Sequence, residues 1–258
     1  MTAGGVNFAD GRIDFAIPAP AREVAPGMLS RNYNAFPCLL PLAYSLFAPL
    51  LFAADPNSSA TVPDHVTAAA IIHELNLARQ NPALYATLLE QTRQNYSGGV
   101  CLLPGNVRMR THEGVRALDD AIQFLRRAKP QPPLALSAGL CLAAADHCRE
   151  QAGGATGHYG SKGGDPGNRI SRYGIVTQGW AENIAYGRHT AGEIVLALIV
   201  DDGVRGRGHR KNIFNPTYNV AGAAYGPHAR FGCVCSIDFA NGYAENRFAR
   251  GSDAQNSF

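Results

Sequence analysis

The most informative segment of the chain is Gly208-His209-Arg210-Lys211-Asn212-Ile213-Phe214-Asn215-Pro216. Three glycines in close order lead into its histidine, and a proline closes it. Because glycine permits a tight backbone approach and proline fixes φ, the segment predicts a shaped loop. The following residues, 218–226, have the composition of a β-strand. A histidine held on a rigid loop beside a strand is a candidate site residue.

The length and composition describe an ordinary folding chain. Its 258 residues suit one large domain or one domain with extensions, and 46% hydrophobic against 17% charged residues provides a real core. The formal net charge of +3 is too small to indicate a nucleic-acid partner, and no alternation of basic and aromatic residues supports one. We therefore expect a globular domain that does not bind nucleic acid.

The first 60 residues differ from the rest. Residues 1–27 are rich in glycine, alanine and proline without a sustained period, and we interpret them as a non-native or disordered extension before a true start at Met28. A basic residue, Arg31, then precedes an uncharged apolar run over 35–54, and small residues follow. This order is typical of a secretory signal, so residues 28–60 are predicted to be a signal peptide.

A membrane anchor is the alternative for this run. At about 20 residues it barely reaches the minimum for a membrane span, and three prolines interrupt it. The cleaved signal is therefore favoured, and no later segment is long and apolar enough to span a membrane. We expect a secreted protein, extracellular or periplasmic, without a transmembrane segment once the signal is removed.

Helical periodicity and capping residues predict four helices. The expected helices are 64–90 with Asp64 as cap and a break at Asn81-Pro82, 113–128, 138–150 capped by Ser137, and 191–200 capped by Thr190. Two strands are expected at 220–225 and 232–239, joined by a turn at 226–228. Helices followed by paired strands predict a mixed α/β (α+β) domain with antiparallel pairing.

The cysteines and one further histidine suggest structural roles. Cys141 and Cys148 lie seven residues apart in a predicted helix, about 10 Å, which is too far for a disulfide. Buried free thiols are the preferred interpretation, and the six cysteines give no readable disulfide framework. His147, near the end of the same helix, is interpreted as interacting with the helix dipole.

Three points carry the functional signal. His158 stands in a glycine-rich loop, Glu182 in Ala-Glu-Asn-Ile-Ala, and His209 in the opening segment. The sequences of these motifs and their order along residues 66–243 resemble the CAP superfamily. That superfamily groups cysteine-rich secretory proteins, insect venom antigen 5 and plant pathogenesis-related proteins of class 1, along with bacterial SCP-like secreted proteins. Asn76, Arg79, Pro82 and Tyr85 are similar to the first-helix signature of that family.

The resemblance implies a three-layer α-β-α sandwich with a central antiparallel sheet. It implies a CAP domain over residues 61–245 and a tail at 246–258. Compared with the short bacterial members of the family, residues 91–132 form an insertion.

The resemblance also implies a surface cleft where two histidines and two acidic residues meet. His158, His209 and Glu182 match three of these positions, and the second acid falls at Asp201, or at Asp202 if the loop is counted differently. Two imidazoles with carboxylates suit Zn²⁺ or another divalent metal with open coordination positions. The expected metal ligands are therefore His158, His209, Glu182 and Asp201.

Two functions from different classes fit this cleft. The first is a non-enzymatic domain that binds a divalent metal and, as the resemblance implies, a lipid, sterol or other extracellular ligand. The second is a metal-dependent hydrolase of peptide or cell-wall bonds, with Glu182, His158 and His209 as its catalytic groups. No nucleophile stands in a recognisable setting, which favours the first. The sequence does not identify the ligand or the oligomeric state.

Overall fold

The computed structural model describes residues 66–103, 107–160, 164–247 and 249, and all of them belong to one compact unit. The predicted extension 1–27, the predicted signal peptide 28–60 and Cys38 lie outside the described residues.

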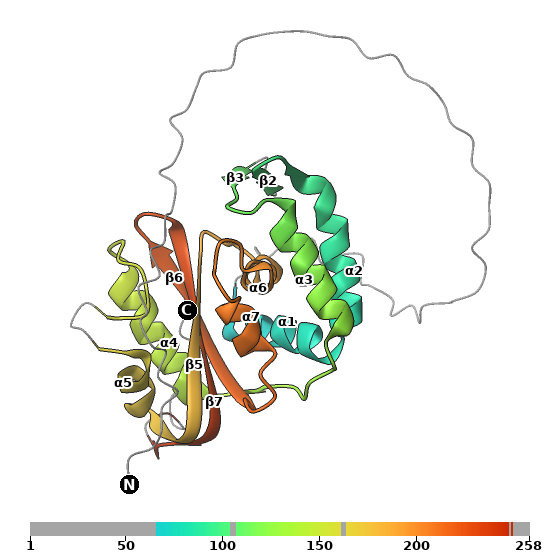
Figure 1. The fold of residues 1–258 in the computed structure, drawn as a ribbon. Coiled ribbons are helices and arrows are strands. Elements are labelled where there is room, and N and C mark those ends of the chain that lie inside the picture. Colours follow the sequence, from blue (N-terminus) through green and yellow to red (C-terminus); the bar gives the residue numbers. More distant parts are fainter. Residues whose placement is uncertain (1–65, 104–106, 161–163, 248, 250–258) are drawn as a thin grey trace, which may run out of the picture. The chain divides into compact units, whose positions relative to one another are not determined.

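A four-stranded sheet forms the centre of the described unit (Figure 1). Its order is β4 (Ala135–Leu136), β6 (Val220–His228), β7 (Gly232–Glu245) and β5 (Gly174–Tyr186). The three long strands pair antiparallel, as predicted, whereas the short β4 pairs parallel with β6. The longest pairing joins β5 to β7, and β5 forms one edge of the sheet.

Helices α4 (Ala138–Gln151) and α5 (Pro166–Ser171) cover one face of the sheet. Ser137 caps α4 through a bond from the Leu140 amide, as predicted from the sequence. The approach of α4 to β6 is close: a Cβ added at Gly222 would lie 2.2 Å from the Cys141 backbone nitrogen. A glycine is therefore required at this position of β6.

The opposite face carries a second helical layer, visible to the right of the sheet in Figure 1. It contains α1 (Ala68–Gln80), α6 (Ala191–Val200) and α7 (Gly208–Ile213), with α2 (Pro82–Thr92) and α3 (Val115–Arg127) packed beyond them. The main hydrophobic core lies here and includes Leu75, Leu118, Ile194, Ile237 and Phe239. Two helical layers around one sheet confirm the predicted α-β-α sandwich.

The predicted insertion contains α3 and a small sheet of its own. After a 3-10 turn at Arg93–Asn95, strands β1 (Tyr96–Ser97), β2 (Val100–Leu103) and β3 (Val107–Arg110) pair antiparallel in sequence order. Helix α3 packs against α2, and its buried face includes Leu118, Ile122 and Leu125. The insertion is thus an ordered part of the second layer.

Several local predictions are wrong. The N-cap of α1 is Thr67, whose hydroxyl accepts from the Ala70 amide, whereas Asp64 lies outside the described residues. Residues 208–213 form the short helix α7 instead of a loop. The turn predicted at 226–228 belongs to β6, which continues to His228. The sequence did not predict strand β5, because glycines stand at both ends of its first half, at Gly174 and Gly179. The pairing of this half with β7 also shifts register between Val176 and Gly179.

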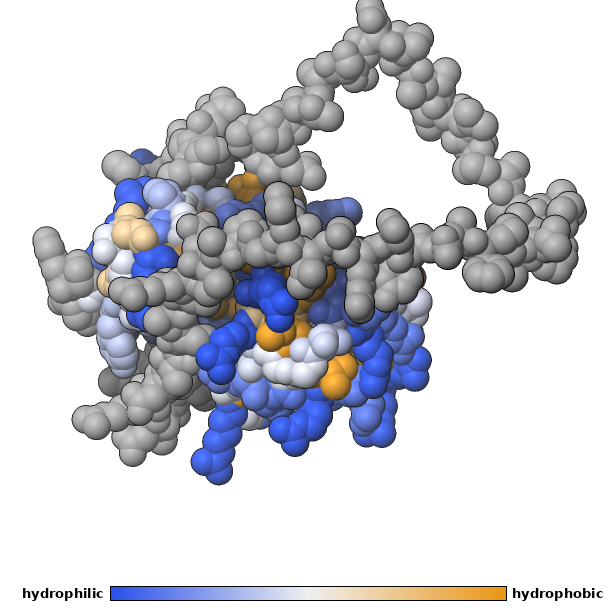
Figure 2. All heavy atoms as spheres, turned by 90° about the horizontal axis from the view of Figure 1, so that it is seen from above, coloured by the Kyte–Doolittle hydropathy of each residue, from blue (hydrophilic) through white to orange (hydrophobic). Residues whose placement is uncertain are grey.

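The described cysteines are all buried free thiols, as predicted for Cys141 and Cys148. In the view of Figure 2, hydrophilic side chains cover most of the described surface, and hydrophobic ones form small groups between them. Within the described ranges, no helix combines the length and the apolar character needed to cross a membrane.

Candidate functional site

His158 and Glu182 form the first half of the predicted site. His158 lies in the loop that follows α4, and its Nδ1 is 2.8 Å from Oε1 of Glu182. Glu182 projects from β5 toward the α4–α5 layer and is buried, while about a third of the His158 side chain is exposed. The carboxylate therefore fixes the imidazole tautomer with Nδ1 protonated and Nε2 directed away.

The Glu182 carboxylate is held from several sides. Arg169 Nη2 lies 2.7 Å from Oε2, and the Ser236 hydroxyl donates to the same oxygen at 3.1 Å. Although burial acts to raise the pKa of Glu182, the hydrogen bond from His158 and the charge of Arg169 outweigh it and lower the pKa. Glu182 is therefore the ionised member of this cluster.

Arg169 of α5 ties this half of the site together. Besides Glu182, its guanidinium donates to the carbonyl oxygens of His158 at 2.9 Å and Gly164 at 3.2 Å. Its Nη1 is also 3.7 Å from Oε2 of Glu150, and the residue is 1% exposed. One buried cation thus holds both the histidine backbone and the carboxylate that orients its ring.

His147 is a third histidine at this half-site. Its ring is completely buried, its Nε2 donates to the Gly157 carbonyl at 2.9 Å, and the same nitrogen is 3.9 Å from Glu182. Burial lowers the pKa of His147 more than Glu182 raises it, so the ring is neutral. The helix-dipole interpretation, which needs a charged ring, is wrong. Its place on the buried face of α4 was the available signal.

Asp238 is a buried acid directly beside Glu182. It is the cross-strand partner of Glu182 on β7 and is fully buried, and neither carboxyl oxygen has a hydrogen-bond partner among the described residues. Burial, followed by the charge of Glu182, raises the pKa of Asp238 well above its usual range. We infer that Asp238 is protonated, which leaves Glu182 with the single negative charge of this pair.

His209 and Asp201 form the second half of the site. His209 Nδ1 lies 2.7 Å from Oδ1 of Asp201, and the His209 amide donates to Oδ2 at 3.0 Å. Asp201 is the C-cap of α6 with φ of 55°, in the left-handed region. This conformation turns its buried carboxylate toward the first turn of α7, where His209 lies.

The structure separates the two candidates for the second acid. Asp201 bonds His209, whereas Asp202 accepts hydrogen bonds from the backbone amides of His112 and Glu113 in the insertion. Asp201 is therefore the candidate whose carboxylate reaches His209, from a C-cap with left-handed backbone conformation.

Strand β5 connects the two halves through consecutive residues. Glu182 faces the α4–α5 layer, and Asn183 faces the opposite layer, since neighbouring side chains alternate along a strand. Asn183 Nδ2 donates to the His209 carbonyl at 3.1 Å, and Asn212 donates to Asn183 Oδ1 at 2.9 Å. Among the described residues, no hydrogen bond or ion pair joins the two histidines directly, so the connection runs through Glu182-Asn183.

The donor set fits a metal only in part. Both carboxylates are occupied by their histidines and by neighbouring donors, so they act as groups that orient imidazoles. Neither His158 Nε2 nor His209 Nε2 bonds to any described residue. Within the same residues, no three His, Cys, Asp or Glu side chains are placed to hold one ion. The imidazoles thus remain the groups suited to a divalent metal, and the metal itself stays a prediction.

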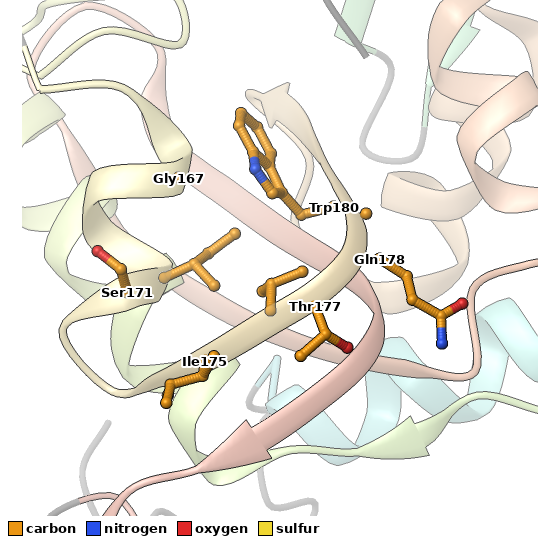
Figure 3. Close-up of a pocket in the computed structure, with 10 residues that line it drawn as sticks. Gly167, Ser171, Ile175, Thr177, Gln178 and Trp180 are labelled. Carbon is orange, nitrogen blue, oxygen red and sulfur yellow. The ribbon is translucent and has the colours of Figure 1, made fainter. Parts of the chain in front are cut away.

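A separate apolar pocket lies between α5 and β5 (Figure 3). Its volume is about 300 Å³, and its lining includes Gly167, Ile170, Ile175, Val176 and Trp180. None of the predicted site residues lines it. The lipid or sterol ligand implied by the family resemblance remains a prediction, and the pocket does not identify it.

Comparison with known proteins agrees with the motifs of the sequence. Residues 111–237 match the model of the cysteine-rich secretory protein family, CAP. This part of the chain, which contains both histidine–carboxylate pairs, therefore belongs to the CAP superfamily. The curated proteins contain no sequence that matches the chain.

Two solved structures are similar to part of the chain. An extracellular protein containing a SCP domain from Bacillus anthracis str. Ames shares 20% identity, covering 49% of this chain and 39% of its own, with a TM-score of 0.35. An outer surface protein from Borrelia burgdorferi shares 16% identity, covering 43% of this chain and 79% of its own, with a TM-score of 0.35. The matched part thus spans less than half of the Bacillus chain.

Proposed function

We propose that this chain is an exported CAP domain whose paired histidines, His158 and His209, bind a divalent metal such as Zn²⁺. The observation that carries the proposal is the shared geometry of the two pairs. In each, a buried carboxylate holds Nδ1 at 2.7–2.8 Å, which leaves Nε2 as the nitrogen available to a metal. Export is supported by the apolar run and its basic flank in residues 28–60.

The same geometry favours binding over hydrolysis. A general base needs a free, accessible acceptor near the substrate proton. Glu182 is buried, and both its oxygens already accept hydrogen bonds, from His158 on one side and from Arg169 and Ser236 on the other. A bound Zn²⁺ would supply Lewis acidity at the two imidazoles, while Glu182 and Asp201 would maintain their orientation.

Calorimetric titration with zinc tests this proposal. We expect one site per chain in the wild type and a loss of at least about 100-fold in affinity in both His158→Ala and His209→Ala, because each variant removes one of two imidazole ligands and losing a group that only orients a ligand already costs about 10–100-fold. His73→Ala, which changes an exposed histidine of α1, is the matched control and should bind like the wild type. Equal zinc affinity in all four proteins would contradict the proposal that His158 and His209 bind the metal.

A further inference from the structure

The insertion makes reciprocal hydrogen bonds with the loop 201–207 between α6 and α7. The Asp202 carboxylate accepts from the backbone amides of His112 at 2.7 Å and Glu113 at 2.8 Å. In return, Glu113 Oε1 accepts from the Gly203 amide at 2.9 Å. Charged groups take part in all three bonds, so they are stronger than neutral ones. Two segments far apart in sequence are therefore joined next to Asp201.

Arg207 connects the insertion to Asp201 itself. Its Nη1 and Nη2 bind the Glu113 carboxylate in a bidentate pair at 2.7 and 2.8 Å, and its Nε is 3.1 Å from Asp120 Oδ2. Nη1 also donates to the Asp201 carbonyl at 2.7 Å. The bond and charge of Arg207 lower the pKa of Glu113 to about 2, so this carboxylate is ionised at neutral pH.

A second arginine, Arg210 of α7, also joins the insertion to the end of α6. Arg210 Nη1 lies 3.0 Å from Asp120 Oδ2, while Nε and Nη2 donate to the carbonyl oxygens of Ile199 and Val200 at the end of α6. Asp120 of α3 thus bonds both arginines, one before and one after His209. The insertion therefore contacts the sequence neighbours of both members of the Asp201–His209 pair.

The backbone of the loop explains why such support is needed. Asp201 and Arg207 are the two described non-glycine residues with positive φ, at 55° and 56°. Residues other than glycine rarely adopt this backbone conformation, and those that do persist where surrounding contacts hold them in place. Both residues take part in the contacts just described, and one of them provides the carboxylate that orients His209.

We propose that the insertion is a brace that holds the loop 201–207 and thereby keeps Asp201 aligned with His209. Glu113 and Asp120 of the insertion and their partner Arg207 in the loop are the positioning residues; they act through the Asp201–His209 pair. The effect on metal affinity rests on the proposed function, whereas the effect on the His209 ring does not. The His158 half is supported by Arg169 from α5, and none of the three positioning residues bonds to its described residues.

The test compares Glu113→Gln and Asp120→Asn with Asp119→Asn. Asp119 is the adjacent residue on α3 and pairs with Arg93, away from the loop, so it is the matched control. The metal-free readout is the nitrogen-15 NMR signature of the two histidine rings, which reports their tautomers. We expect the His209 ring to lose its fixed tautomer in Glu113→Gln and Asp120→Asn, with the His158 signals unchanged, and Asp119→Asn to match the wild type.

Zinc titration of the same proteins provides the second readout. We expect affinity about 10-fold weaker in the two brace variants and unchanged in the control, which is the scale typical of groups that orient metal ligands. If the wild type binds no zinc, the proposed function fails while the NMR comparison still decides the brace.

Arg207→Gly keeps the test decisive if a carboxylate variant fails to fold. Glycine adopts positive φ without a steric penalty, so this change removes the guanidinium contacts without adding backbone strain. We expect it to disturb the His209 ring as Glu113→Gln does. A His209 signature that stays wild-type in folded Arg207→Gly would overturn the brace.

Discussion

Arg169→Met is expected to lower the free energy of unfolding by about 3–5 kcal/mol, the usual cost of removing one partner from a buried ion pair. Methionine preserves much of the side-chain volume but leaves the Glu182 carboxylate buried without its cation. It also removes the donors to the carbonyl oxygens of His158 and Gly164. Denaturant unfolding followed by the fluorescence of Trp180, the single tryptophan of the chain, measures the effect.

Two further variants show whether the charge is the cause. Arg172→Met changes an exposed arginine at the end of the same helix, and we expect a loss below about 1 kcal/mol because exposed ion pairs contribute little. Combining Arg169→Met with Glu182→Gln removes the unpaired charge and should recover part of the stability. A cost for Arg169→Met as small as that of Arg172→Met would contradict the role assigned to this ion pair.

Arg79→Met is the second substitution with a large expected effect, about 2–6 kcal/mol of destabilisation, because its bonds to the Ile213 and Tyr218 carbonyl oxygens are buried and each buried carbonyl left without a donor costs about 1–3 kcal/mol. Arg79 of α1 is fully buried and donates to the carbonyl oxygens of Pro132 and of Ile213, Asn215 and Tyr218, at and after the end of α7. The same fluorescence-monitored unfolding measures the loss.

Arg126→Met is the matched control for Arg79→Met. Arg126 is an exposed arginine of α3 that pairs with Glu90, so its removal should change the free energy of unfolding by less than about 1 kcal/mol. If Arg79→Met unfolds at the same denaturant concentration as the wild type, the bonds from α1 do not support the segment after α7.

Much of the fold follows from local sequence patterns. The caps Ser137 and Thr190 and the break at Asn81-Pro82 all occur as predicted, because each depends on residues within one helical turn. Strand β5 was missed because it pairs with β7, a strand distant in sequence, and its own pattern is interrupted by glycines. Register with a distant strand is not visible in a local window.

The site shows the same division. The family resemblance identified His158, Glu182 and His209, and the structure places each histidine against a carboxylate. Arg169 carries no local signal, because an arginine in a helix is usually exposed, whereas the only signal for His147 is its place on the buried face of α4. The choice between Asp201 and Asp202 depended on a left-handed backbone conformation at the end of α6, which helix periodicity does not predict.

A crystal structure of the protein soaked with zinc, with anomalous scattering recorded at the zinc edge, tests the two-histidine site most directly. We expect a single strong peak bonded to Nε2 of both His158 and His209, with each Nδ1 still bonded to Glu182 or Asp201. The absence of a peak at the histidines, or a peak bonded to the carboxylates in their place, would contradict the proposed metal site.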